Sequence, residues 1–297
     1  MADDATLNSC KPQVQTAAAD APTLASSCVF AMLSDRGRVR HSNQDACAAL
    51  PEHGVFVVCD GMGGAAGGEV ASHLATQTFL DCLAHRHCPA SDSAASDPVA
   101  GNTSATRPRA RIAEAIRAAN QAVYRHSRKL PSLHGMGTTL VALLREDDAQ
   151  RPEKARVSPT PTLWIAHVGD SRCYLFRYGE LHQLTEDHSL VEEQVRAGLL
   201  SRVQATASPM CNIITRAVGS QPTVVPEIAS HAAQPGDLYL LSSDGLTREL
   251  DDDEIAHILA RTAGSAATLD TACHALVDAA NAKGGRDNIT VLLVACP

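Results

Sequence analysis

Short apolar runs that lie next to an acidic residue recur along the chain. Runs of about four to eight residues rich in Val, Ile, Leu and aromatic side chains predict buried strands. The runs and their acidic neighbours are 55–58 with Asp60, 163–168 with Asp170, 238–242 with Asp244, and 289–294 with Asp287 before it. A further strand is predicted at 28–33, and a hairpin at 173–184. The pattern predicts a sheet-rich domain with acidic side chains at strand ends.

Helical spacing appears in the segments between these runs. The clearest set of apolar residues steps by four, three and four positions: Ile112, Ile116, Ala119 and Val123. Apolar faces at helical spacing are also predicted for 70–83, 190–200 and 269–280. Residues 251–254 give an N-terminal capping pattern for the helix that follows them. The chain is therefore expected to form a mixed α and β domain.

The acidic strand ends have two interpretations. Each aspartate alone is compatible with a solvated turn, because Asp-Gly dipeptides are typical of turns. A carboxylate directly after buried apolar residues, such as Asp60, instead costs several kcal/mol unless it is paired. Glycines 61, 63 and 64 remove side chains just after Asp60, which allows a ligand to approach the backbone. The recurrence of the pattern favours a shared cation site at one rim of a sheet.

Composition agrees with a soluble domain. The 297 residues are enough for a sizeable core, and a formal net charge of −8 argues against a nucleic-acid-binding surface. The ten cysteines are scattered without a CxxC pair, and Cys59, Cys273 and Cys296 fall in apolar runs. That usage favours reduced, buried thiols in a cytoplasm over a disulfide framework or a zinc site. No apolar run reaches membrane-spanning length, and no signal peptide is expected.

The domain organisation is predicted from composition. Residues 1–27 are rich in Ala, Thr, Ser and Pro and are expected to form a flexible tail ahead of one domain at 28–297. A variable Ala/Ser/Pro-rich surface insertion is predicted at about 86–110. His85 and His87 at its start are compatible with a metal site, but a solvated pair is the better interpretation.

Seven segments together resemble a known family. They are GRVRHSNQDAC (37–47), VVCDGMGGAAGGEVAS (57–72), GMGTTL (135–140), IAHVGDSRCYLFRYGELHQLTEDHS (165–189), ITRAVG (214–219), LLSSDGL (240–246) and GGRDNITVLLV (284–294). In this order they are similar to the metal-dependent serine/threonine phosphatases of the PP2C (PPM) family, in its bacterial form. The resemblance implies an α+β fold: a four-layer α-β-β-α sandwich of two mainly antiparallel sheets flanked by helices. It also implies a flap beside the active site at about 190–217.

The resemblance also implies a set of site residues. Asp60 is expected to bridge two metal ions, with the carbonyl of Gly61 on one of them. Asp244 and Asp287 complete the other ion's ligands, with Asp45 reaching the centre directly or through water, while Asp170 and Asp244 share a third, looser ion. Oxygen ligands suit Mn²⁺ or Mg²⁺. Arg40 matches the family's phosphate-gripping arginine, a role that suits a planar guanidinium.

The reaction implied is direct attack of metal-activated water or hydroxide on phosphoserine or phosphothreonine. Asp60 and Arg40 are the expected catalytic residues. The partners implied are phosphorylated proteins and a Hanks-type kinase that the enzyme opposes. A cytoplasmic monomer that binds neither nucleic acid nor membrane is expected. Two rival hypotheses are a catalytically silent domain that binds phosphorylated partners and a stress-response module dedicated to one anti-sigma antagonist.

Two positions and one segment depart from the family pattern, and the role of one histidine is open. Gln44 stands where many relatives have glutamate, which removes a charge beside Asp45. Met62 stands where eukaryotic members often have histidine, so the group that protonates the leaving oxygen is either water on the metal or an unidentified residue. His188 is compatible with a general acid, although a structural role is favoured. The flap has Ser208–Asn212 in place of a His-Pro-x-x-Asn segment, so substrate selectivity does not carry over.

Overall fold

The computed structural model describes residues 28–84, 106–146, 161–206, 208–210, 212–262 and 266–295. The predicted tail at 1–27 lies outside these residues, as do His85, His87, Cys296 and the 86–105 part of the predicted insertion. The remaining part, 106–110, is helical.

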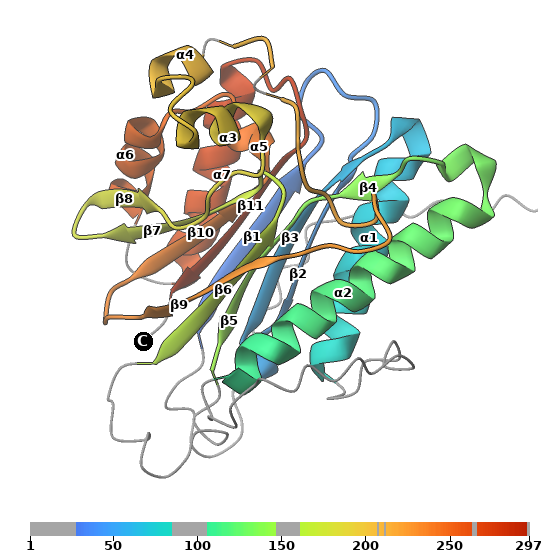
Figure 1. The fold of residues 1–297 in the computed structure, drawn as a ribbon. Coiled ribbons are helices and arrows are strands. Elements are labelled where there is room, and N and C mark those ends of the chain that lie inside the picture. The colour runs from blue at the N-terminus through green and yellow to red at the C-terminus, as the bar shows by residue number, and fades with distance from the viewer. Residues whose placement is uncertain are drawn as a thin grey trace, which may run out of the picture.

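The described strands form two antiparallel sheets. The first sheet has the order β1-β11-β10-β7-β8, and the second has β2-β3-β5-β6-β9 (Figure 1). The strands of the first are β1 (Val29–Asp35), β7 (Arg172–Arg177), β8 (Glu180–Gln183), β10 (Leu238–Ser242) and β11 (Ile289–Ala295). Those of the second are β2 (Asp45–Leu50), β3 (Val55–Met62), β5 (Leu140–Arg145), β6 (Thr162–Val168) and β9 (Glu227–Ala232). A two-residue strand, β4 (Gly137–Thr138), pairs with the end of β3.

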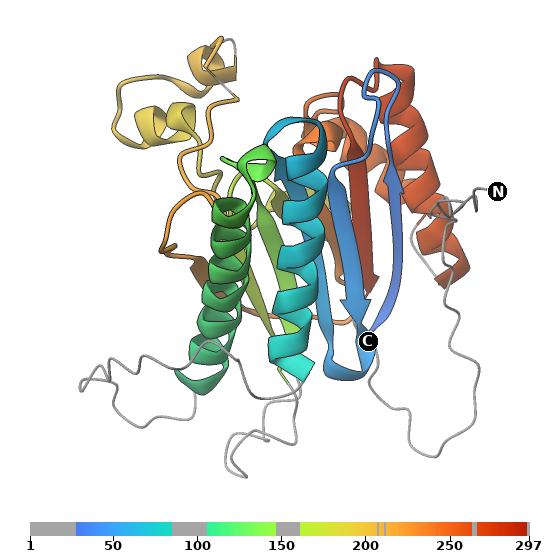
Figure 2. The same cartoon turned by 90° about the vertical axis from the view of Figure 1, so that its right-hand side faces the viewer.

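Helices cover the outer face of each sheet. Helices α1 (Gly64–Ala84) and α2 (Thr106–Lys129) pack side by side on the second sheet, and Figure 2 shows both in front of it. Helices α6 (Asp252–Thr262) and α7 (Ala266–Ala282) cover the first sheet. The short helices are α3 (Leu190–Arg196), α4 (Arg202–Thr206) and α5 (Asp244–Thr247), with 3₁₀ turns η1 (Pro51–His53) and η2 (Pro131–Leu133). The predicted four-layer sandwich is confirmed.

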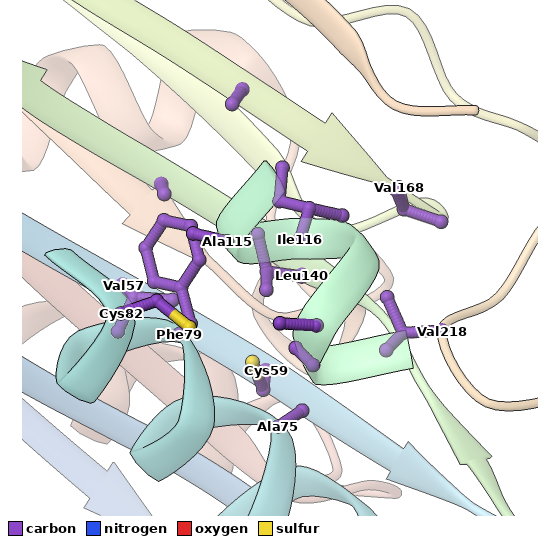
Figure 3. Packing of buried hydrophobic residues seen from close by; sticks show 14 of the residues in the cluster. Val57, Cys59, Ala75, Phe79, Cys82, Ala115, Ile116, Leu140, Val168 and Val218 are labelled. Atoms are coloured by element: carbon purple, nitrogen blue, oxygen red, sulfur yellow. The ribbon is translucent and has the colours of Figure 1, made fainter. Parts of the chain in front are cut away.

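Three apolar layers follow from the alternation of side chains along the strands. In β3, Val57 faces α1 and α2, whereas Phe56 and Val58 face the other sheet. In β10, Leu240 likewise faces the helices and Leu241 faces the sheet opposite. Figure 3 shows the layer under α1 and α2, which is built around Phe79, Ile116 and Leu140. Because both faces of the central strands are buried, their sequences are nearly continuous apolar runs.

Most predicted elements are present, with shifted boundaries. The predicted capping pattern is confirmed: the backbone N–H of Glu254 donates to Oδ1 of Asp251 at 2.9 Å, and that of Asp251 donates to Oε2 of Glu254 at 3.1 Å. The predicted helix at 190–200 ends at Arg196, shortly before Gly198, whose φ of 72° is left-handed. The hairpin turn lies at Tyr178-Gly179 instead of 179–180.

Strand β9 and helix α4 were not predicted from the sequence. Strand β9 has the polar sequence EIASHA and lies at the edge of its sheet, so neither of its faces carries a full apolar pattern. Helix α4 lies within the flap segment and has only five residues. Among the described helices, none is long and apolar enough to cross a bilayer. Cys59 and Cys273 are buried thiols, as predicted.

Candidate metal centre

The five predicted carboxylates come together at one edge of the two sheets. Asp45 and Asp60 lie opposite each other in the pairing of β2 with β3. Asp244 begins α5 directly after β10, and Asp287 lies in the turn before β11. Asp170 follows β6. Two adjoining hollows of about 620 and 700 Å³ share Arg40, Asp244 and Asp287 in their walls; the first adds Asp60 and the second adds Asp170.

Asp60 is held by two threonines of the GMGTTL segment. Its backbone N–H donates to Oγ1 of Thr139 at 2.9 Å, and its carbonyl accepts from Oγ1 of Thr138 and from the N–H of Thr139, both at 2.8 Å. Thr139 lies at the break between β4 and β5, where its N–H donates to the Asp60 carbonyl and its Oγ1 accepts from the Asp60 N–H. Burial raises the pKa of Asp60 well above its ordinary value, and the neighbouring carboxylates, Asp45 first, raise it further.

Asp45 is buried and lies in the wall of neither hollow. Its Oδ2 accepts a hydrogen bond from Oγ1 of Thr290 at 2.6 Å, and Thr290 in turn contacts Oγ of Ser34 at 2.7 Å. Burial raises the pKa of Asp45 to about 7, with smaller contributions from Asp244 and Asp287. The threonine hydroxyl acts in the opposite direction because it favours the charged form.

Gly61 is required by close backbone contacts. A Cβ at this position would lie 2.1 Å from the carbonyl oxygen of Gly68 and 2.5 Å from that of Gln44. The N–H of Gly61 donates to the same Gln44 oxygen at 3.1 Å. Gly63 and Gly64 then take φ values of 124° and 74°, which L side chains rarely adopt. The start of α1 thus packs directly on the backbone that presents the Gly61 carbonyl.

Gln44 has a hydrogen-bonding function that a glutamate lacks. Its Nε2 donates to the carbonyl oxygen of Gly64 at 2.7 Å, so the side chain braces the glycine loop at the start of α1. Its backbone N–H donates to Oδ1 of Asn288 at 2.8 Å. Asn288 also donates from Nδ2 to the carbonyls of Arg36 and Ser42, both at 2.9 Å. One asparagine therefore fixes the loop that carries Arg40.

Asp170 lies in a turn that is tied to the same threonine. The preceding Gly169 has a φ of 107°, and a Cβ there would lie 2.6 Å from Cγ2 of Thr139. Oγ of the following Ser171 lies 2.7 Å from Oγ1 of Thr139. Burial raises the pKa of Asp170 to about 7, and the charges of Asp244 and Asp187 add to the shift. Thr139 thus connects the Asp60 and Asp170 strand ends.

Two guanidinium groups converge on Asp287. Nη2 of Arg40 lies 2.7 Å from Oδ2 of Asp287, and Nη1 of Arg248 lies 3.2 Å from the same oxygen. Arg248 also forms an ion pair with Asp244, four residues before it. Arg248 was not predicted from the sequence, although its spacing from Asp244 corresponds to one helical turn.

The donor set fits hard divalent cations. Within the described residues, Oδ1 of Asp45, Asp170 and Asp244 is buried and has no hydrogen-bond partner. Burial also raises the pKa of Asp244. A buried carboxylate oxygen without a donor is costly, and a cation coordinated by several such oxygens removes the cost. Carboxylates and a backbone carbonyl are the ligands that Mg²⁺ and Mn²⁺ prefer.

Comparison with known proteins follows the same motifs. A family model described as protein phosphatase 2C matches residues 35–280. The chain belongs to the protein phosphatase 2C family. Membership confirms the predicted enzyme class, a protein-serine/threonine phosphatase, and the predicted bacterial form agrees with the relatives described next.

Three relatives of this phosphatase 2C chain are informative. The serine/threonine phosphatase stp of Listeria monocytogenes serotype 4b is 35% identical over 88% of this chain and 93% of its own. The S. agalactiae serine/threonine phosphatase structure has a TM-score of 0.74 at 32% identity, covering 90% of this chain and 99% of that one. The structure of the catalytic domain of PstP in complex with two manganese ions has a TM-score of 0.69 at 33% identity, covering 91% of this chain and 99% of that one.

Proposed function

We propose that the chain hydrolyses phosphoserine and phosphothreonine in proteins at a centre that holds two Mn²⁺ or Mg²⁺ ions. The observation that carries the proposal is the convergence of five carboxylates, three of which have a buried oxygen without a partner among the described residues. The two manganese ions bound by the related PstP catalytic domain support the choice of metal. When bound, such ions supply an activated water nucleophile and neutralise charge at phosphorus.

The ligands are assigned by position. Asp60 is proposed to bridge the two ions, with the Gly61 carbonyl on one side and Asp244 and Asp287 on the other. Asp45 lies opposite Asp60 in the pairing of β2 with β3 and is proposed to reach the centre directly or through a water. Asp170 and Asp244 face the second hollow together, where they are proposed to hold a third ion.

Arg40 is the proposed phosphate-binding residue. Its side chain is 49% exposed and lines both hollows, while one edge of the guanidinium pairs with Asp287. The remaining N–H groups are available for bidentate contact with phosphoryl oxygens. Met62 also lines the first hollow and has no proton to give. We therefore assign protonation of the leaving serine or threonine oxygen to water.

The wider setting is proposed on the same basis. Residues 28–297 are proposed to form one catalytic domain, with a flap at about 190–217 beside the second hollow. The substrates are proposed to be proteins phosphorylated by a Hanks-type kinase. A net charge of −8 supports a partner other than nucleic acid. We propose a cytoplasmic monomer.

The decisive experiment compares the intact chain with Asp60→Asn and Asp278→Asn. Asp278 is an exposed residue of α7 and serves as the matched control. Hydrolysis of p-nitrophenyl phosphate and of a phosphothreonine peptide is measured with Mn²⁺, with Mg²⁺ and with EDTA. We expect metal-dependent turnover that EDTA and Asp60→Asn abolish and that Asp278→Asn retains. If the metal-loaded intact chain turns over neither substrate, the catalytic proposal fails and a domain that binds phosphorylated partners becomes the better hypothesis.

A further inference from the structure

One buried histidine joins the flap to the turn that carries Asp170. His188 immediately precedes the flap, and its side chain is 1% exposed. Its backbone N–H donates to the carbonyl of Gly169 at 3.0 Å, and its carbonyl accepts from the N–H of Thr215 at 2.8 Å. His188 therefore contacts the turn before Asp170 and both the beginning and the end of the flap.

The flap closes on itself at the same place. The N–H of Leu190 donates to the carbonyl of Ile213 at 2.8 Å, and Ser189 pairs with Ile214 in an isolated β-bridge. Figure 1 shows α3 and α4 of the flap at the end of the sheets, beyond β6 and β10. Movement of His188 would thus be transmitted to the whole flap through its base.

The imidazole of His188 is held at both nitrogens. Nδ1 accepts from the backbone N–H of Gly169 at 3.0 Å, so the proton of the neutral ring is on Nε2. Nε2 lies 3.1 Å from Oε1 of Glu227, which also accepts from Nη1 of Arg216 at 3.1 Å. Burial, the stacked His167 ring and Arg216 lower the pKa of His188 to about 4, whereas Glu227 opposes the shift.

A metal site is the first alternative for this cluster. His167, His188 and Glu227 each place a potential ligand atom within 4.8 Å of the other two. The two imidazole rings, however, are stacked with centroids 4.7 Å apart and an interplanar angle of 16°, so their in-plane lone pairs do not converge on one point. Nη1 of Arg216 lies 3.1 Å from both Nε2 of His188 and Oε1 of Glu227. A guanidinium already holds the position that a cation would need.

We propose that His188 is a positioning residue of the phosphatase reaction: it fixes the Asp170 turn relative to the base of the flap. Its Nδ1 accepts from the Gly169 N–H, and its Nε2–H donates to Glu227, which Arg216 also contacts. The inference rests on the proposed function, because Asp170 and the flap border the hollow assigned to substrate and metal. His167 is the natural comparison, since it is buried in the same cluster but its Nε2 contacts the carbonyl of Glu186 instead, at 2.7 Å.

The test compares His188→Ala with His167→Ala in the intact chain. Amide hydrogen exchange at Gly169 is the first readout, because this N–H is the donor to His188. We expect exchange at Gly169 to accelerate by about tenfold or more in His188→Ala, the equivalent of one lost hydrogen bond, and by less than about twofold in His167→Ala. Glu227→Ala is the second variant if His188→Ala does not fold, since the Glu227 side chain is 39% exposed and lies on an edge strand.

Kinetics with Mn²⁺ form the second readout. In His188→Ala, we expect the KM for a phosphothreonine peptide to rise by roughly tenfold, while the KM for p-nitrophenyl phosphate changes by less than about twofold, because the small substrate does not reach the flap. His188→Ala is also expected to lower kcat. This loss should be smaller when His188→Ala is made in an Asp170→Asn background than in the wild type, since the two residues act through one turn. His167→Ala is expected to show neither effect.

The outcomes separate the two proposals. If wild-type protein is inactive but Gly169 exchange still accelerates in His188→Ala, the phosphatase proposal fails, while the hydrogen bond by which His188 holds the Asp170 turn is still supported. If wild-type protein is active and His188→Ala matches His167→Ala in Gly169 exchange and in both KM values, the positioning role is overturned.

Discussion

Asp45 and Asp60 face each other across adjacent antiparallel strands, one residue from β2 and one from β3. Directly opposed like charges destabilise a sheet. The hydroxyl of Thr290 donates a hydrogen bond to Asp45 in this pair. The paired carboxylates lower the stability of the protein without metal, whereas they favour the binding of a cation. Removing one of the two charges should therefore raise the stability without metal and weaken metal binding.

Asp45→Asn is expected to stabilise the protein without metal and to weaken its response to metal. Because the pKa of Asp45 is about 7 in the folded chain, against an ordinary value of 3.8, its contribution to stability falls as pH rises from 4 to 7. Asparagine removes this cost, on the order of 4 kcal/mol at pH 8. Thermal unfolding in EDTA should show a higher Tm at pH 8 and a smaller gain at pH 5, whereas the increase in Tm on adding Mn²⁺ should shrink. A lower Tm in EDTA at pH 8 would contradict the argument, and Asp278→Asn is the control.

Gln44→Glu tests the bracing of the glycine loop. A carboxylate cannot donate to the carbonyl of Gly64, so both Gln44→Glu and Gln44→Met should lower the unfolding free energy in EDTA by about 1 kcal/mol. Calorimetry with and without Mn²⁺ should then separate them, because the added charge beside Asp45 increases the stabilisation by Mn²⁺ in the glutamate variant alone. Equal responses to Mn²⁺ in the two variants would show that charge at this position has no effect on the centre.

Arg248→Gln is expected to tighten Mn²⁺ binding. The guanidinium pairs with Asp244 and Asp287, so an incoming cation competes with it for carboxylate oxygens. The side chain is 35% exposed, which limits the effect to roughly threefold to tenfold in Kd. Isothermal titration with Mn²⁺ measures it, and Arg261→Gln, an exposed arginine of α6, is the matched control. Unchanged or weaker binding would indicate that Arg248 does not compete with the metal.

The sequence predicted the layers better than the connections between them. Strands such as 55–58 and 238–242 are buried on both faces, so their apolar runs indicate them directly. Strand β9 lies at an edge with a polar sequence, and only its register with β6 defines it. At the centre, the acidic strand ends were visible as a pattern. The role of Thr139 was not, because it depends on contacts with Asp60 and Ser171 that are distant in sequence. For Arg248, only its spacing from Asp244 was visible, and its contact with the distant Asp287 was not.

The pH dependence of folding gives an independent test of the His188 environment. Because the pKa of His188 is about 4 in the folded chain, against an ordinary value of 6.5, the residue binds a proton on unfolding throughout pH 4 to 6.5. Stability due to this residue is therefore fully present above pH 6.5 and is lost as pH falls through that window. Without metal, the unfolding free energy of the wild type is expected to exceed that of His188→Asn by an amount that shrinks by about 2 kcal/mol between pH 7.5 and pH 5.

Chemical denaturation at several pH values measures the unfolding free energy of both proteins. Subtracting one free energy from the other cancels the opposite pH trend of the buried carboxylates, which both proteins share. His167→Asn is the comparison for a neighbouring buried imidazole. Burial also lowers the pKa of His167, so the difference in unfolding free energy between wild type and His167→Asn should narrow as the pH falls. A wild-type advantage that stays constant from pH 7.5 to pH 5 would mean that His188 takes up its proton in the folded protein. The neutral Nε2–H tautomer, and with it the acceptor for the Gly169 amide, would then have to be abandoned.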